Sequence, residues 1–107
     1  METTDELLRE VVERITAVVD AETVIVFGSR ARGDETPESD LDLLIVADSD
    51  LPRYRRAVSL RRALRDIGPE KDILVYTPSE VDEWRSAPTS LIATALREGK
   101  VLYEKRH

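Results

Sequence analysis

The 107-residue chain contains no cysteine, one histidine and no long apolar run. Without cysteine it forms no disulfide bond, which fits a reducing compartment. No window reaches the ~18 apolar residues of a membrane span, and the opening METTDELLRE lacks the basic and then apolar order of a signal peptide. We therefore expect a cytoplasmic protein. The one histidine, His107, ends the chain and is a poor candidate for a base or a metal ligand.

An excess of positive charge is also missing, because the formal net charge is -6 and the isoelectric point is about 4.8. Phosphate contacts need a net basic footprint, so direct nucleic-acid binding through the whole surface is not expected. The chain is 41% hydrophobic and 36% charged, with 4 glycines and 5 prolines, which is typical of a folded globular protein. Its length suits a single domain over residues 1–107.

Helical and strand patterns alternate along the chain. Capping-box spacings at Thr3 with Glu6 and at Thr77 with Glu80 mark two helix starts. The patterns predict helices over 4–19, 52–67, 78–85 and 90–98, and strands over 23–27, 41–46, 72–76 and 100–103, the last of them at a sheet edge. Residues 28–40 are expected to form a loop. This order predicts an α/β fold with one small sheet.

Two aspartates stand at the start of the second predicted strand, in Asp40-Leu41-Asp42. Side chains alternate faces along a strand, so Asp40 and Asp42 point the same way with Cα atoms ~6.6 Å apart. Two carboxylates on one face repel each other unless a positive charge lies between them. A hard divalent cation such as Mg²⁺ meets that need, because it takes carboxylate oxygens and leaves positions for substrate phosphates.

Gly28 and Ser29 follow the first predicted strand directly. The free backbone N–H groups and the serine hydroxyl there can face an anion, and the glycine adds no Cβ to crowd it. The pair alone also fits a plain turn at the end of a strand. Together with the aspartates it predicts a seat for a metal-bound triphosphate, whose ions would neutralise charge on the transferred phosphoryl group.

A third carboxylate, Asp72, opens the predicted strand over 72–76. An adjacent strand lies within ~5 Å and would bring Asp72 to the same cluster. Three carboxylates can hold two ions and deprotonate a hydroxyl. Asp72 is therefore a candidate metal ligand, a candidate base, or both.

The run Gly28-Ser29, ten further residues, Asp40-Leu41-Asp42, and a later strand opening with Asp72 resembles the polymerase beta-like nucleotidyltransferase superfamily. More narrowly, it is similar to the minimal nucleotidyltransferases, called MNT proteins, whose MntA members are antitoxins. The resemblance covers nearly the whole chain, up to the ending Glu98-Gly99-Lys100-Val101-Leu102-Tyr103.

The resemblance implies a single-domain nucleotidyltransferase fold with a small mixed sheet between helices, and an enzyme that uses Mg²⁺ and ATP. Gly28, Ser29 and Arg32 would contact the triphosphate, and Asp40, Asp42 and Asp72 would be the catalytic and metal-binding residues. By the same resemblance the chain is a type VII-like antitoxin. It would transfer AMP to a tyrosine hydroxyl of a HEPN-domain RNase toxin and assemble with that partner.

Two other functions compete with this one. A binding module would neutralise its partner by contact alone, with nucleotide serving only to shape the interface. An enzyme acting on a small molecule is disfavoured, because this short chain supplies no separate acceptor-binding domain.

Arginines raise a separate question. Arg30 and Arg32 either steady phosphates or tie the loop to Asp34, Glu35 or Glu38, and loop ion pairs are the better interpretation for Arg30. In the predicted helix 52–67, four arginines fall on the face opposite the leucines; they are Arg55, Arg61, Arg62 and Arg65. A solvated face and a docking surface for a partner or for RNA both remain open, since the rest of the chain is acidic.

Overall fold

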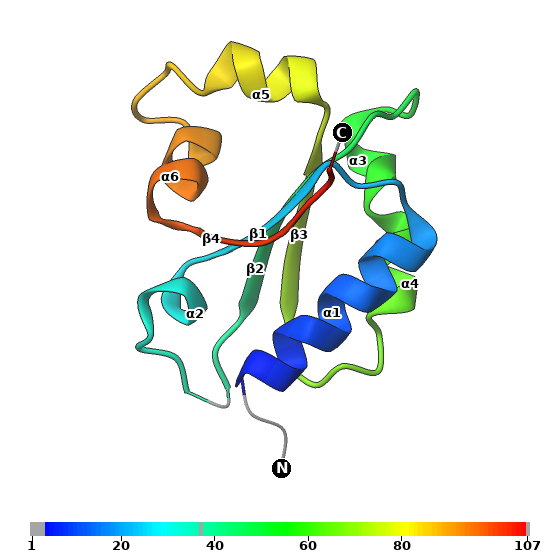
Figure 1. Cartoon of the computed structure of the whole chain (residues 1–107), viewed down its shortest axis with the longest axis vertical. Helices are drawn as coiled ribbons and strands as arrows, with labels where there is room; N and C mark the ends of the chain where they lie inside the picture. The colour runs from blue at the N-terminus through cyan, green and yellow to red at the C-terminus, as the bar shows by residue number, and fades with distance from the viewer. Residues whose placement is uncertain (1–3, 37, 107) are drawn as a thin grey trace.

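A mixed four-stranded sheet organises the computed structural model, which describes residues 4–36 and 38–106. The elements, in chain order, are α1 (Thr4–Val18), β1 (Thr23–Phe27), α2 (Ser29–Arg32), β2 (Leu41–Val46), α3 (Arg53–Arg56), α4 (Val58–Ala63), β3 (Lys71–Tyr76), α5 (Pro78–Trp84), α6 (Leu91–Glu98) and β4 (Lys100–Glu104). The strands lie in the order β3-β2-β1-β4 (Figure 1). β1 pairs antiparallel with β2 and β4, whereas β2 and β3 are parallel. This confirms the predicted α/β fold with one small mixed sheet.

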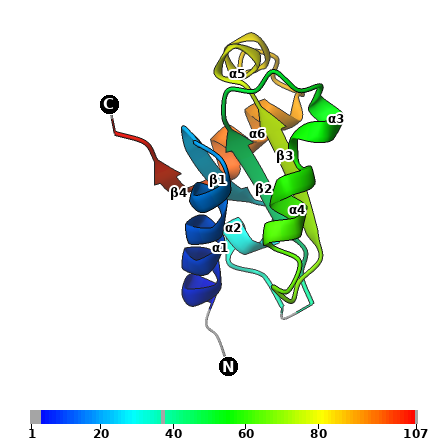
Figure 2. The same cartoon turned by 90° about the vertical axis from the view of Figure 1, so that its right-hand side faces the viewer.

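One face of the sheet carries the larger apolar layer. Its strand residues include Val26, Leu43 and Val75, which pack against α1 and α4. The two helices cross this face side by side in Figure 2, and α1 inserts Val11 and Ile15, both fully buried. Leu41 and Leu43 belong to this layer, as the alternation of the strand predicts. Even-numbered residues of β2 consequently face the other side.

The second face is covered by shorter helices. Ile25, Phe27 and Leu44 pack there against Ala95 of α6, and Val46 meets α5 and α6 nearby. α5 and α6 lie toward the end of the sheet where β2 and β3 finish, and α2 lies near the opposite end (Figure 1). The start of β2 and β3 on this face is therefore left without a long covering helix.

Most predicted elements are confirmed, with two corrections. The single helix expected over 52–67 is instead two short helices separated at Ala57, and Leu64 to Asp66 form a turn. The expected loop after Gly28 contains the helix α2. Thr3, of the first capping box, lies outside the described residues.

The second capping box is confirmed. The Thr77 hydroxyl accepts a hydrogen bond from the Glu80 N–H (3.2 Å), and the Glu80 carboxylate accepts one from the Thr77 N–H (2.8 Å). Pro78 occupies the first turn, where its missing N–H costs nothing. In the described residues, no helix combines the length and apolar character that crossing a membrane requires.

Candidate active site

The register of the parallel pair places Asp42 of β2 directly opposite Asp72 of β3. Adjacent strands lie about 4.8 Å apart, so the two carboxylates leave the same face of the sheet as close neighbours. On the other side of β2, Phe27 of β1 is paired with Asp42, and Gly28 follows it. The sheet thus brings three separate segments of the chain to one point.

Asp40 lies one residue before β2 begins and is exposed, as is Asp72, whereas Asp42 is half-buried. The pKa of Asp42 is raised, first by burial and then by the negative charges of Asp72 and Asp40. Asp72 lies opposite Asp42 in register and Asp40 precedes β2 directly, so the charges of both reach the Asp42 carboxylate. Within residues 4–36 and 38–106, however, no three acidic or histidine side chains are drawn together into a ready metal cluster.

Gly28 is in contact with the Asp42 carboxylate. Its φ of 74° and ψ of -152° belong to a conformation that L residues with a Cβ rarely adopt. A Cβ built there would lie 2.3 Å from Asp42 Oδ2. The glycine therefore leaves open the space beside the carboxylate, and Ser29 starts α2 at that point.

Arg32 ends α2 on the solvent side. Its Nε lies 3.4 Å from Asp34 Oδ2, and its positive charge opposes the rise in the Asp42 pKa. Arg32 is thus close enough to act on the acidic group while its side chain stays exposed. Its predicted ion pair within the loop is confirmed, and a phosphate contact remains a prediction.

Arg30 has a role that the expected loop ion pairs do not describe. It is 7% exposed, and it donates from Nη2 (2.9 Å) and Nε (3.3 Å) to the Ser39 carbonyl oxygen. Ser39 directly precedes Asp40, so this buried guanidinium fixes the chain where the first aspartate enters the site. The acceptor of both bonds is a backbone carbonyl oxygen, whereas the sequence predicts a carboxylate of Asp34, Glu35 or Glu38.

The helix α2 stands where the sequence pattern predicts a loop, although Gly33 is a local signal for the end of a helix. Gly33 closes α2 in a left-handed conformation with φ 81°, and its N–H bonds to the Ser29 carbonyl oxygen (3.1 Å). A glycine just after Ser29-Arg30-Ala31-Arg32 is the usual end of a short helix. This pattern places Arg30 on a helix, and its burial is a tertiary feature that the pattern does not specify.

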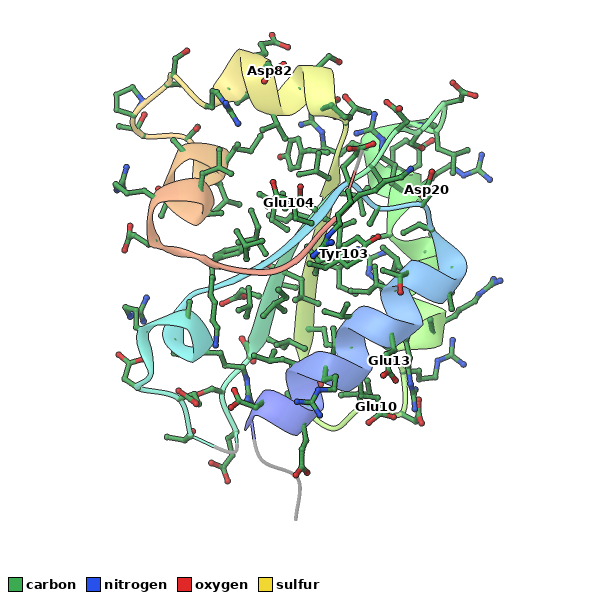
Figure 3. The ribbon with its side chains drawn as sticks, viewed as in Figure 1. Glu10, Glu13, Asp20, Asp82, Tyr103 and Glu104 are labelled. Carbon is green, nitrogen blue, oxygen red and sulfur yellow. The ribbon has the colours of Figure 1, made fainter. Side chains whose placement is uncertain are left out.

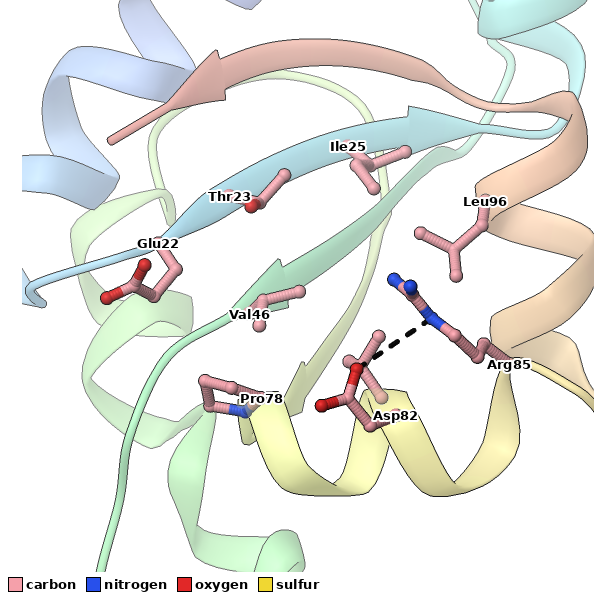
Figure 4. A pocket seen from close by; sticks show the side chains of 9 residues that line it. Glu22, Thr23, Ile25, Val46, Pro78, Asp82, Arg85 and Leu96 are labelled. Carbon is pink, nitrogen blue, oxygen red and sulfur yellow. Dashed lines mark ion pairs between the residues drawn. The ribbon is translucent and has the colours of Figure 1, made fainter. Parts of the chain in front are cut away.

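A separate pocket occupies the far end of this sheet face (Figure 4). Its volume is about 200 Å³, and Ile25, Val46 and Leu96 line its apolar side. Asp82 of α5 and Arg85, the residue after this helix, form an ion pair of 3.9 Å at its rim. Val46 is four residues, or about 13 Å, along β2 from Asp42, so the aspartates lie outside this pocket.

Comparison with known proteins decides the family. Residues 9–107 match the family model described as Polymerase beta, Nucleotidyltransferase. The chain belongs to this nucleotidyltransferase family. The predicted resemblance, which rested on Gly28-Ser29 and the aspartates, is thereby confirmed.

A relative in Methanocaldococcus jannaschii is named "Putative protein adenylyltransferase MJ0604". It is 67% identical over 27 residues, which are 25% of this chain and 27% of that protein. The match thus spans about a quarter of the relative's length.

Solved nucleotidyltransferase structures share the fold. One is described as a "putative nucleotidyltransferase from Sulfolobus solfataricus" and superposes with a TM-score of 0.66 at 25% identity, covering 95% of this chain and 81% of its own. A toxin-antitoxin crystallised with AMP-PNP gives a TM-score of 0.69 at 19% identity, covering 92% and 74%. A mutant toxin-antitoxin, MntA-HpeT, gives 0.66 at 16% identity over the same shares.

Proposed function

We propose that this nucleotidyltransferase transfers AMP from ATP to a hydroxyl group of a partner protein and depends on Mg²⁺. The observation that carries the proposal is the register of Asp42 opposite Asp72, with Asp40 near enough to raise the Asp42 pKa. Three carboxylates on one face of the sheet repel each other, and a bound cation would offset that repulsion. The name of the archaeal relative, a protein adenylyltransferase, agrees with this chemistry.

The residues present suit a divalent cation. Asp40, Asp42 and Asp72 offer only oxygen donors, which Mg²⁺ prefers, and Gly28 keeps the space beside Asp42 Oδ2 clear of a Cβ. Asp40 and Asp72 are exposed and therefore free to turn toward an ion. When bound, Mg²⁺ would neutralise charge on the phosphates.

The same site is suited to hold the triphosphate. Ser29 offers a hydroxyl at the first residue of α2, directly after Gly28. Arg32 supplies an exposed positive charge on the last turn. In this proposal, Gly28, Ser29 and Arg32 contact the phosphates.

The transfer step balances without a further reactant. The acceptor hydroxyl oxygen forms a bond to the α-phosphorus of ATP, and the bond from that phosphorus to the bridging oxygen breaks. Pyrophosphate leaves with the electron pair, and the hydroxyl proton passes to a carboxylate. Asp72 is the base in this proposal, because it is exposed where an acceptor enters and adjoins Asp42 in register.

The acceptor proposed is a tyrosine of a HEPN-domain RNase toxin, which the chain would silence as an antitoxin assembled with that toxin. Two of the structural neighbours are toxin-antitoxin complexes, one of them with AMP-PNP, which supports a toxin partner and an adenine nucleotide. The open start of β2 and β3 suits a macromolecular acceptor.

The proposal is tested by incubating the candidate HEPN partner with this protein, Mg²⁺ and ATP, then measuring both its intact mass and its RNase activity. Asp42→Ala is the matched control. Adenylate-sized mass increments together with lost RNase activity are expected from the wild type alone. An unmodified partner whose RNase is still blocked, by wild type and variant alike, would show inhibition by contact and overturn the enzymatic proposal.

A further inference from the structure

Exposed arginines cluster on α3, α4 and the turn that follows α4. Arg53 and Arg56 of α3 are paired with Glu80, at 3.3 and 2.6 Å. Four other arginines are exposed and have no carboxylate within ion-pair distance among residues 4–36 and 38–106; they are Arg55, Arg61, Arg62 and Arg65. Acidic side chains are instead spread over α1, β4 and α5, as Figure 3 shows for Glu10, Glu13, Glu104 and Asp82.

Arg61 and Arg65 line a pocket of about 240 Å³. Its apolar lining comes from Ile67, Pro69 and Ile73. The Lys71 amine closes the turn below by donating to the carbonyl oxygens of Ile67 and Pro69, the latter at 2.8 Å. The lysine is therefore engaged within the protein, while the two guanidinium groups remain available to a ligand.

Two residues that line the pocket, Lys71 and Ile73, belong to β3, which is an edge strand of the sheet. Farther along this edge, the Val75 carbonyl accepts a hydrogen bond from Arg56 (3.3 Å). β3 ends the strand order, and only β2 pairs with it. The Glu70 carbonyl accepts a hydrogen bond from Leu41 of β2 and the Tyr76 carbonyl one from Ala47, so even-numbered backbone groups of this segment face β2. Backbone groups alternate in direction along a strand, so Lys71 and Ile73 present theirs to the open edge. Both residues line the pocket, and Asp72 lies between them.

The exposed apolar side chains nearby favour a protein ligand. Tyr54 is 78% exposed and Val58 is 41% exposed, and α3 and α4 stand end to end beside β3 (Figure 2). Tyrosine and arginine are enriched at the centres of protein interfaces. Glu70 lines the pocket beside the two arginines, so the positive surface is not continuous, as a long phosphate backbone would require.

We infer that an acidic, extended segment of the protein acceptor docks along the open edge of β3, with its carboxylates on Arg61 and Arg65. The inference rests on the proposed function, because it identifies the acceptor as a protein bearing acidic residues near the modified hydroxyl. A segment in this position runs beside Asp72. The site thereby selects its acceptor through charge as well as through the hydroxyl.

Fluorescence anisotropy without nucleotide tests the docking apart from catalysis. The probe is a labelled synthetic peptide with one tyrosine flanked by several glutamates, and its glutamine counterpart is the reference. The wild type is expected to bind the acidic peptide more tightly, and Arg61→Gln/Arg65→Gln to weaken that binding about tenfold. The matched control Arg9→Gln/Arg97→Gln removes two exposed arginines from other helices and should leave affinity within about twofold.

A charge-reversed variant distinguishes loss of a charge contact from loss of binding through misfolding. Arg61→Glu/Arg65→Glu is expected to prefer a peptide with lysines in place of the glutamates. Equal binding of the acidic and glutamine peptides, or an equal loss in the control variant, overturns the inference. Tighter, arginine-dependent binding of a single-stranded RNA oligonucleotide also overturns it. Arginine-dependent peptide binding without any AMP transfer to peptide or partner would sustain the docking surface and defeat the proposed function instead.

Discussion

Gly28 and Asp42 are in direct contact across the β1–β2 pair, since a Cβ on the glycine would lie 2.3 Å from Asp42 Oδ2. The contact joins the proposed phosphate seat to the carboxylate in the middle of the acidic group. Any side chain at residue 28 must displace that carboxylate or move the start of α2. The geometry of the site therefore depends on a position that carries no functional group.

Gly28→Ala should abolish AMP transfer and lower the free energy of unfolding by about 3 kcal/mol, because it adds a clash to an unfavourable φ. Gly33→Ala is the matched control. Its φ is also positive, at 81°, but an added Cβ meets nothing within 4 Å. It should lose about 1 kcal/mol and keep its activity. Thermal unfolding and transfer assays measure both, and equal losses in the two variants would refute the role of the Asp42 contact.

Asp42→Asn should raise the melting temperature by a few degrees in a chelator while destroying transfer. The folded-state pKa of Asp42 lies above its ordinary 3.8 because of burial, Asp72 and Asp40. Its charge is therefore unfavourable in the folded state, and that penalty grows as pH rises above 3.8 and is complete above the folded pKa. The gain from the variant should be largest at neutral pH and vanish below pH 3.8. A variant that melts lower at pH 7 would contradict this balance.

Glu80 contributes stability with the opposite pH dependence. Hydrogen bonds from Arg56, from the Thr77 N–H and from Arg53 lower its pKa from 4.5 to about 2. The stabilisation is fully present above pH 4.5 and is lost as pH falls toward about 2. Glu80→Gln should lower the free energy of unfolding by about 2 kcal/mol at pH 7 and by progressively less in acid. Glu83→Gln, at an exposed site of the same helix, should change it little, and denaturant titrations at several pH values compare the two.

The elements that the sequence predicts well are those whose pattern and ends agree. β2 is apolar except for Asp42, and α5 begins with a complete capping box at Thr77 and Glu80. The predictions that are wrong concern segments in which tertiary packing overrides the local sequence pattern. The helix expected through 52–67 breaks at Ala57, and of the apolar residues around α4 Leu60 and Leu64 are fully buried while Val58 stays exposed.

In the candidate site as well, some features are predictable from local sequence and others depend on tertiary structure. Asp40 and Asp42 are recognisable from spacing within one strand, and Asp72 from its place at the start of another. The register that sets Asp42 opposite Asp72 is a tertiary property, and no local pattern specifies it. The inward turn of Arg30 likewise depends on α2 and on the Ser39 carbonyl coming together in space.

Arg30→Lys should slow transfer about tenfold while leaving the KM for ATP nearly unchanged, because Arg30 positions the chain before Asp40 and does not face the phosphates. Lysine keeps the charge but cannot reproduce the two bonds from Nε and Nη2 to one carbonyl oxygen. Steady-state kinetics separate kcat from KM, and Arg97→Lys at an exposed site is the control. An unchanged kcat, or a change confined to KM, would show that Arg30 does not act through Asp40.

The central claim, nucleotidyl transfer by the aspartate group, is tested most directly with ATP labelled at either the α- or the γ-phosphorus. The HEPN partner is incubated with each ATP, Mg²⁺ and either wild type or Asp42→Ala. The account predicts that the wild type places only the α-label on the partner and releases one pyrophosphate for each AMP attached, and that the variant does neither. Incorporation of γ-label, or α-label transfer that survives in Asp42→Ala, would contradict it.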